Sequence, residues 1–252
     1  MLKNLTKTLL VCASLLTASA NAAIIDVDLE LQLLADVSGS VDSREYALQL
    51  QGYEQAFRNA NVIDAIENGA IGAIAVQYIE WSGENQQQVQ VNWTLIDSAA
   101  SAFAFADSLD ALARAFGGMT APGSALDFGV AQFTNNGYNA SRQVIDVSGD
   151  GAHNSGVNTA NSRDAAINNG IDTINGITIG NTSGLQAFYQ NNIIGGDNAF
   201  HLHAATFADF TAGIENKLVR EITGVTVPEP SSVALFGLAL LGLASANRKK
   251  AK

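Results

Sequence analysis

Continuous apolar segments and helical spacings of apolar residues alternate along most of the chain. The continuous segments predict buried strands, because strands covered on both faces lack polar positions. They occupy residues 29–35, 69–81, 142–147 and 171–179. Between them, apolar residues recur every three or four positions, which predicts amphipathic helices. These helices are expected at residues 43–59, with Ser43 as N-cap, and at 98–116, 122–134, 158–169, 183–192 and 207–223.

Residues 87–96 have a different pattern, in which Val89, Val91 and Trp93 alternate with polar residues. Alternation predicts a half-buried strand, here paired antiparallel with the preceding strand across a turn at 82–85. A last short strand is expected at 200–205. The whole order indicates an α/β fold, Rossmann-like, whose mainly parallel sheet is covered by helices on both faces and has one antiparallel edge strand.

The first 23 residues have the features of a secretory signal peptide. Lys3 and Lys7 precede an apolar stretch at residues 9–16, and small residues follow, so cleavage is expected after Ala22 or Ala23. The folded domain is then expected at 24–226. The only cysteine, Cys12, lies in the leader, which excludes disulfides, thiolate metal sites and a cysteine nucleophile from the mature chain.

The charge of the chain is strongly negative and lies in the domain. The formal net charge is −11, and all 24 acidic residues fall between Asp26 and Glu229. Such a domain is a poor partner for nucleic acid or an anionic membrane surface. Its charge fits divalent cations and simple solubility equally well.

Asp36, Ser38 and Ser40 follow the first apolar run, where a strand gives way to a helix. Because they alternate, they share one face of an extended segment. Their oxygen atoms suit Mg²⁺ or a similar hard cation, and ligands of open α/β sheets bind at the carboxyl ends of the strands. The pentapeptide by itself is equally compatible with an ordinary turn, since Asp, Ser and Gly favour turns.

Two further junctions between strand and helix carry oxygen ligands. Thr120 follows two glycines and Met119, and Asp150 lies in the turn at 148–151. If the preceding strands are parallel, all three loops meet at one edge of the sheet. Asp146 lies about 13 Å deeper along its strand, and we expect it to make a buried hydrogen bond rather than bind metal.

The segments D-V-S-G-S at 36–40, G-G-M-T at 117–120 and S-G-D-G at 148–151 resemble the metal-ion-dependent adhesion site (MIDAS) of von Willebrand factor A (vWA) domains. The resemblance covers about residues 27–224. The segment 144–154 and the ending from Lys217 to Glu221 are similar to a bacterial, secreted branch of these domains, the DUF1194 type. Two departures are Met119 before the threonine and Ser148, where many members have threonine.

The resemblance implies a bound Mg²⁺, with Mn²⁺ or Ca²⁺ as alternatives, and a partner whose carboxylate completes the metal shell. The metal ligands that it implies are Asp36, Ser38, Ser40, Thr120 and Asp150.

Catalysis at such a metal would need a general base and, for phosphate, cationic groups. His153 is the nearest candidate base, and Arg44 is expected on a helix surface. His201 and His203 form an H-x-H pair that could bind zinc, but no third ligand is evident. The chain has no G-x-S-x-G, H-E-x-x-H or P-loop motif. We therefore expect no enzyme activity.

The last 26 residues resemble the PEP-CTERM sorting signal of Gram-negative bacteria. Pro228, Glu229 and Pro230 precede a short apolar stretch at 233–246 and a basic end at 248–250. A short transmembrane anchor is the plain interpretation of this order. The resemblance implies that an exosortase-type enzyme cleaves near the motif, so that the tail anchors the protein only transiently before release at the cell surface.

Three hypotheses follow from these patterns. The first is a secreted or cell-surface module for metal-dependent adhesion or protein binding. The second is a structural protein of the extracellular matrix or biofilm, in which the metal only stabilises the loops. The third is a metal-dependent hydrolase. The sequence leaves open whether the partner is a protein or a polysaccharide.

Overall fold

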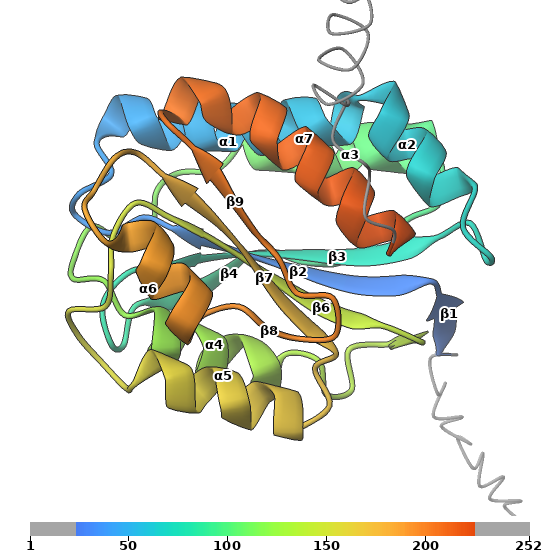
Figure 1. Ribbon diagram of the computed structural model, residues 1–252. Helices are drawn as coiled ribbons and strands as arrows, with labels where there is room; N and C mark the ends of the chain where they lie inside the picture. Colours follow the sequence, from blue (N-terminus) through green and yellow to red (C-terminus); the bar gives the residue numbers. More distant parts are fainter. Residues whose placement is uncertain (1–23, 225–252) are drawn as a thin grey trace, which may run out of the picture.

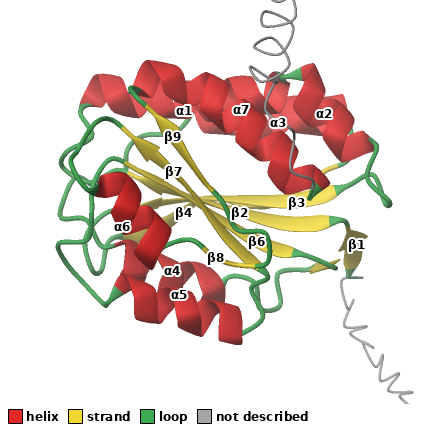
Figure 2. Cartoon of the chain, viewed as in Figure 1, coloured by secondary structure: helices red, strands yellow, loops and turns green. Residues whose placement is uncertain are grey.

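The computed structural model describes residues 24–224, and its centre is a seven-stranded sheet in the order β4-β3-β2-β6-β7-β8, with β9 also paired to β7 (Figures 1 and 2). β2, β3, β6, β7 and β9 are parallel, whereas β4 pairs antiparallel with β3 and β8 pairs antiparallel with β7. The strands are β2 (Leu29–Asp36), β3 (Ile74–Trp81), β4 (Gln87–Ile96), β6 (Gln143–Gly149), β7 (Thr173–Ile179), β8 (Gly195–Gly196) and β9 (His201–Ala204).

Helices cover both faces of the sheet, as Figures 1 and 2 show. One face carries α1 (Ser43–Arg58), α2 (Ala60–Glu67), α3 (Ala99–Asp110) and α7 (Phe207–Thr223). The other face carries α4 (Pro122–Ala131), α5 (Thr159–Asn168) and α6 (Leu185–Asn192). The predicted α/β fold, with its mainly parallel sheet and the antiparallel edge strand β4, is confirmed.

Several details differ from the sequence-based expectation. Asp42, not Ser43, caps α1, because its side chain accepts hydrogen bonds from the amides of Arg44 and Glu45. The helix α3 ends at Asp110 rather than at residue 116. The helix α2 was not expected, and neither were β8 and the two-stranded parallel ribbon of β1 (Ile25–Val27) and β5 (Tyr138–Ala140).

The parallel register sets the edge at which functional loops can meet. β2 is buried along its whole length, and its last residue, Asp36, lies level with Trp81 of β3. On its other side Ala35 pairs with Ser148 of β6. The segments that follow β2 and β6 therefore leave the sheet at the same edge. Both ends of the described chain lie at the opposite edge, near β1 and the end of α7 (Figure 1).

The expected signal peptide at 1–23, the cleavage site and the sorting tail at 227–252, with its apolar stretch, lie outside the described residues. Between residues 24 and 224, no helix has both the length and the apolar character needed to cross a membrane.

The contact between α1 and α7 depends on the absence of a side chain at Gly52. A methyl group there would lie 2.6 Å from a ring carbon of Phe210. Overpacking of this kind is destabilising, so we expect Gly52→Ala to lower the free energy of unfolding by about 1–3 kcal/mol. Chemical denaturation measures this change. Gln55→Ala, at an exposed position of the same helix, should stay within about 0.5 kcal/mol of the wild type, and equal losses in the two variants would contradict the prediction.

Candidate functional site

The five residues that the sequence singles out lie together at the carboxyl edge of the sheet. Asp36 ends β2, and Ser38 and Ser40 follow it in the loop before α1. Thr120 lies just before α4, and Asp150 directly follows β6.

Hydrogen-bond contacts connect these side chains from one loop to the next. The Thr120 hydroxyl donates to the Ser38 hydroxyl at 3.3 Å, and the Ser38 and Ser40 hydroxyl oxygens are 3.2 Å apart. The Ser40 hydroxyl donates to Oδ1 of Asp150 at 2.6 Å. Oδ1 of Asp36 accepts the backbone N–H of Ser38 at 2.7 Å. Three loops distant in sequence thus present their oxygen atoms to one another.

The cluster extends from the core of the domain to its surface. Asp36, Ser38 and Thr120 are buried, Asp150 is partly buried and Ser40 is exposed. Oδ2 of Asp36 has no hydrogen-bond partner although it is buried. Burial, and secondly the negative charge of Asp150, raise the pKa of Asp36 to about 7. Burial also raises the pKa of Asp150. A buried carboxyl group next to a second carboxylate is a place where a cation is stabilising.

Gly149 allows the two carboxylate-bearing loops to approach closely. A methyl group at this position would lie 2.8 Å from Oδ2 of Asp36 and 2.5 Å from the Tyr189 hydroxyl oxygen. That hydroxyl is buried without a hydrogen-bond partner. Any larger residue at 149 would displace Asp36 or Tyr189.

Arg114 supports the first loop, and sequence reasoning missed it. Its guanidinium donates to the carbonyl oxygens of Val37 at 2.7 Å and Ser38 at 2.6 Å. The adjacent N–H of Ala115 donates to the Glu80 carboxylate of β3 at 2.8 Å. These bonds explain why α3 stops early, since the segment after Asp110 bonds to the sheet instead of continuing the helix. Arg44, which was expected on a helix surface, is exposed.

The extra residue Met119 leaves Thr120 in place. The Met119 side chain is 52% exposed, and its carbonyl oxygen accepts the Ser82 hydroxyl at 3.0 Å. Thr120 is held by Asn154, because its N–H donates to Oδ1 of Asn154 at 2.7 Å and its carbonyl oxygen accepts the Asn154 N–H at 3.0 Å. The sequence analysis also did not identify Asn154 as a support for Thr120. The only feature that could have indicated this role is its position four residues after Asp150.

Asp146 lies apart from this cluster. It is fully buried and forms an ion pair with Lys217 of α7 at 2.6 Å. The expected buried hydrogen bond is therefore an ion pair, whose partner the sequence did not suggest.

His201 and His203 lie on β9, and His153 lies in the loop three residues after Asp150. His201 and His203 both contact the Thr178 hydroxyl, at 2.9 Å and 3.1 Å. Nδ1 of His153 is buried without a hydrogen-bond partner.

The donor set fits a hard divalent cation. Two carboxylates and three hydroxyls are oxygen ligands of the type that Mg²⁺, Mn²⁺ and Ca²⁺ prefer. Within residues 24–224, no group of three or more His, Cys, Asp and Glu side chains is placed to hold a metal. A metal ion held here would therefore take most of its protein ligands from the hydroxyls of Ser38, Ser40 and Thr120. The unpartnered Asp36 oxygen fits this interpretation.

Solved structures with a similar fold include a byssus matrix protein and a pilus adhesin. Proximal thread matrix protein 1 (PTMP1) of the mussel byssus superposes with a TM-score of 0.61 and 12% identity over 79% of this chain and 48% of its own. A PTMP1 structure with a zinc-occupied MIDAS motif superposes with a TM-score of 0.57 and 11% identity, over 79% of this chain and 49% of its own. The pilus adhesin SpaC of Lactobacillus rhamnosus GG superposes with a TM-score of 0.56 and 15% identity, over 79% of this chain and 31% of its own. This chain thus spans about half the length of PTMP1.

The chain shares its fold with these neighbours, and the residues at the edge of its sheet resemble the MIDAS of vWA domains. The family described as "Protein of unknown function (DUF1194)" matches residues 26–226, and the chain belongs to that family. A PEP-CTERM protein-sorting motif matches residues 226–249 and indicates an exported protein sorted to the cell surface. The search of curated proteins found no match.

The raised pKa of Asp36 predicts a pH dependence for the metal-free protein. The folded state keeps a proton on Asp36 up to about pH 7, whereas the unfolded chain releases it near pH 4. The stabilisation is therefore complete below about pH 4 and is lost as the pH rises through 7. In EDTA at pH 8, we expect Asp36→Asn to be more stable than the wild type by roughly 2–4 kcal/mol.

Denaturation curves between pH 4 and 8 measure this difference. Asp64→Asn, at an exposed position of α2, is the matched control and should keep the wild-type slope. A wild-type slope in Asp36→Asn would show that Asp36 does not titrate in this range.

Proposed function

We propose that this protein is an exported adhesion or protein-binding module that binds a partner carboxylate through a divalent cation, Mg²⁺ in the first place. The observation that carries the proposal is the run of hydrogen-bond contacts from Thr120 through Ser38 and Ser40 to Asp150, beside the unpartnered Asp36 oxygen. In this proposal Asp36 and Asp150 supply the negative charge, and the three hydroxyls supply neutral lone pairs. Arg114 fixes the carbonyl groups of the first loop.

The charge of this donor set favours an outside ligand. A divalent cation held by few carboxylates and several neutral hydroxyls keeps an affinity for a further anionic oxygen. A Glu or Asp side chain of a protein, or a uronate of a matrix polysaccharide, supplies such an oxygen. Exposed Ser40 and partly buried Asp150 lie on the open side of the cluster, so a partner can reach the metal there.

The position of the chain ends suits a surface-displayed module. The end of α7 lies at the edge of the sheet opposite to the candidate metal loops (Figure 1), and the sorting motif follows at 226–249. A tail held at the membrane until an exosortase-type enzyme cleaves it would leave the metal edge facing outward. The similar folds of a byssus matrix protein and a pilus adhesin support an extracellular role. We infer a binding function without catalysis.

A structural role is the second candidate. In that case the cation only neutralises Asp36 and Asp150 and holds the three loops together. The full burial of Asp36 favours this alternative, since an uncompensated buried carboxylate is destabilising. The two roles differ in whether the bound cation captures a carboxylate.

Metal binding itself is the first prediction. Titration calorimetry with Mg²⁺ should show one site in the wild-type protein, and Asp36→Ala and Asp150→Ala should each weaken binding at least about tenfold, that is by about 1.4 kcal/mol. Asp64→Asn is the charge-matched control and should bind as the wild type does. Circular dichroism confirms that each variant is folded. Absence of Mg²⁺, Mn²⁺ and Ca²⁺ binding in the wild type would refute both candidate roles.

Carboxylate capture is the second prediction. Immobilised poly-L-glutamate and a polyuronate are the probes, and the methyl ester of each is the uncharged control. We expect the wild-type protein to bind at least one carboxylate probe in Mg²⁺, and EDTA or Ser38→Ala to reduce the binding about tenfold or more. Metal binding without capture of either probe would favour the structural role. Capture that survives EDTA would contradict the proposed mechanism.

A further inference from the structure

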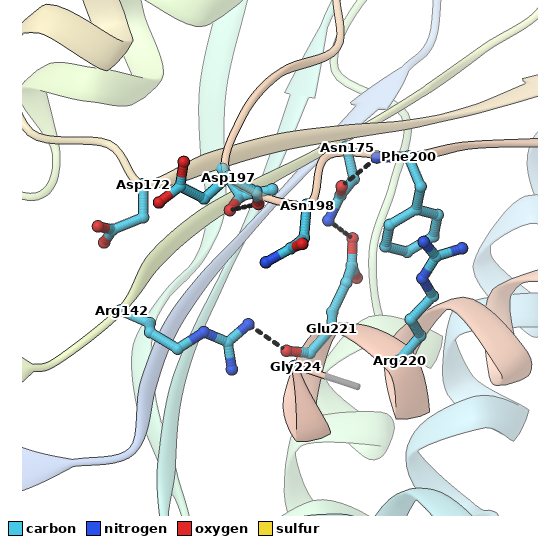
Figure 3. Close-up of a pocket in the computed structure, with 10 residues that line it drawn as sticks. Arg142, Asp172, Asn175, Asp197, Asn198, Phe200, Arg220, Glu221 and Gly224 are labelled. Atoms are coloured by element: carbon cyan, nitrogen blue, oxygen red, sulfur yellow. Dashed lines mark hydrogen bonds between the residues drawn. The ribbon is translucent and has the colours of Figure 1, made fainter. Parts of the chain in front are cut away.

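Three ionisable side chains are buried together between α7 and the sheet. Lys217 and Glu221 lie one helical turn apart on α7, and Asp146 projects from β6; their exposures are 0%, 1% and 0%. Nζ of Lys217 lies 2.6 Å from Oδ1 of Asp146 and also contacts Oε1 of Glu221. Nδ2 of Asn175 donates to the same Glu221 oxygen at 2.8 Å (Figure 3).

This cluster carries one ammonium and two carboxyl groups, so full ionisation would leave a net negative charge in the core. In the part of the chain that the structure describes, Lys217 is the only cation in ion-pair contact with Asp146. Neither Asp146 oxygen has a hydrogen-bond partner. Burial, only partly offset by Lys217, raises the pKa of Glu221 to about 7 and also raises that of Asp146. Glu221 can therefore hold or release a proton near neutral pH.

We propose that Lys217 and Asp146 condense to an intramolecular isopeptide bond, with Glu221 as the proton carrier. Glu221, as a carboxylate, takes a proton from the Lys217 ammonium. The neutral amine attacks Cγ of Asp146 and forms the C–N bond. The C–O bond to one Asp146 oxygen breaks, and this oxygen leaves as water. Both protons of that water come from the Lys217 nitrogen, and Glu221 delivers one of them. The products are a neutral amide and one water molecule, and no oxidant, reductant or cofactor is required.

The geometry brings the two reacting groups together before reaction. Nζ lies 2.6 Å from the Asp146 carboxyl oxygen, and groups held at about 3–3.5 Å in a fixed orientation react as if at very high concentration. In bulk water an ammonium and a carboxylate are more stable than the amide. Full burial weakens this preference, because removing ions from water is costly whereas an amide is neutral.

The released water has an exit beside the cluster. A cavity of about 230 Å³ is lined by Asn175, Glu221, Phe200 and Arg220, among others (Figure 3). The Arg220 guanidinium of α7 stacks on the Phe200 ring at 3.7 Å, and both side chains line the cavity. Glu221 thus lies between the cavity and Lys217, where a proton carrier is needed.

Asp146 is the acyl partner rather than Glu221. Asn175 holds Oε1 of Glu221, whereas Asp146 has no other partner than Lys217. A bond to Asp146 also connects β6 to α7, two elements far apart in sequence. Since the mature chain is expected to contain no cysteine, such a bond would be its covalent cross-link.

Peptide mapping of the purified full-length chain tests the proposal directly. The protein is denatured, digested with trypsin and analysed by mass spectrometry, so the state of its two ends does not affect the result. We expect peptide 143–163 joined to peptide 164–220, with a mass lower than their sum by one water, and no cleavage after Lys217. Free peptides 143–163 and 164–217 as the main species would overturn the proposal. A link from Lys217 to Glu221 would overturn the choice of Asp146.

Two variants separate the role of Glu221 from that of the surrounding cavity. Glu221→Gln keeps the size of the side chain but cannot carry a proton, so linking should be slowed about a hundredfold or more in freshly synthesised protein. Asp197→Asn, which lines the same cavity, should link as the wild type does. Unchanged linking in Glu221→Gln would remove Glu221 from the reaction. Circular dichroism of Glu221→Gln and Asp197→Asn must match that of the wild type, because an unfolded variant would not bring Lys217 and Asp146 together.

Discussion

The parallel register of β2 with β6 is the constraint on which both acidic clusters of this domain depend. Ala35 lies opposite Ser148, so Asp36 and Asp150 follow at the same edge, with Gly149 leaving room between them. The same register places Asp146 on the face that α7 covers. A slip of one residue would turn every side chain of β6 to the opposite face. Asp146 would then lose Lys217, and the loop of Asp150 would move away from Ser40.

The two clusters handle negative charge in different ways. Asp146 and Glu221 are compensated from within the fold, because Lys217 lies between them. Among residues 24–224, no cation forms an ion pair with Asp36 or Asp150, since the guanidinium of Arg114 bonds to carbonyl oxygens of the loop instead of to their carboxylates. Burial raises the pKa values in both clusters. The internal cluster contains its own cation, whereas under the proposed function the cluster at the sheet edge takes its positive charge from a bound metal ion.

The sequence predicts those features of the fold and the site that depend on residues close together in the chain. Apolar runs identify the main strands, and Asp36 and Asp150 are recognisable because each lies directly at a strand end. Arg114 was missed because the apolar spacing continues to residue 116, and only the distant partners Glu80, Val37 and Ser38 end the helix earlier. Lys217 and Glu221 have the spacing of an exposed helical ion pair. Their burial follows from Asp146 on another element, which no local pattern reveals.

The two clusters lie on one mechanical path through the domain. The described chain ends at Gly224, directly after α7, and the sorting motif follows. A force between a tethered tail and a partner at the metal edge would enter α7, cross to the sheet and leave through the loops after β2 and β6. Apolar packing against α1 resists sliding of α7 only weakly, since such contacts are not directional. The connection from Lys217 to Asp146 joins α7 to β6 itself, and β6 leads within four residues to Asp150. If the module binds under tension, the buried cluster therefore lies where a connection between α7 and β6 would resist the force most directly.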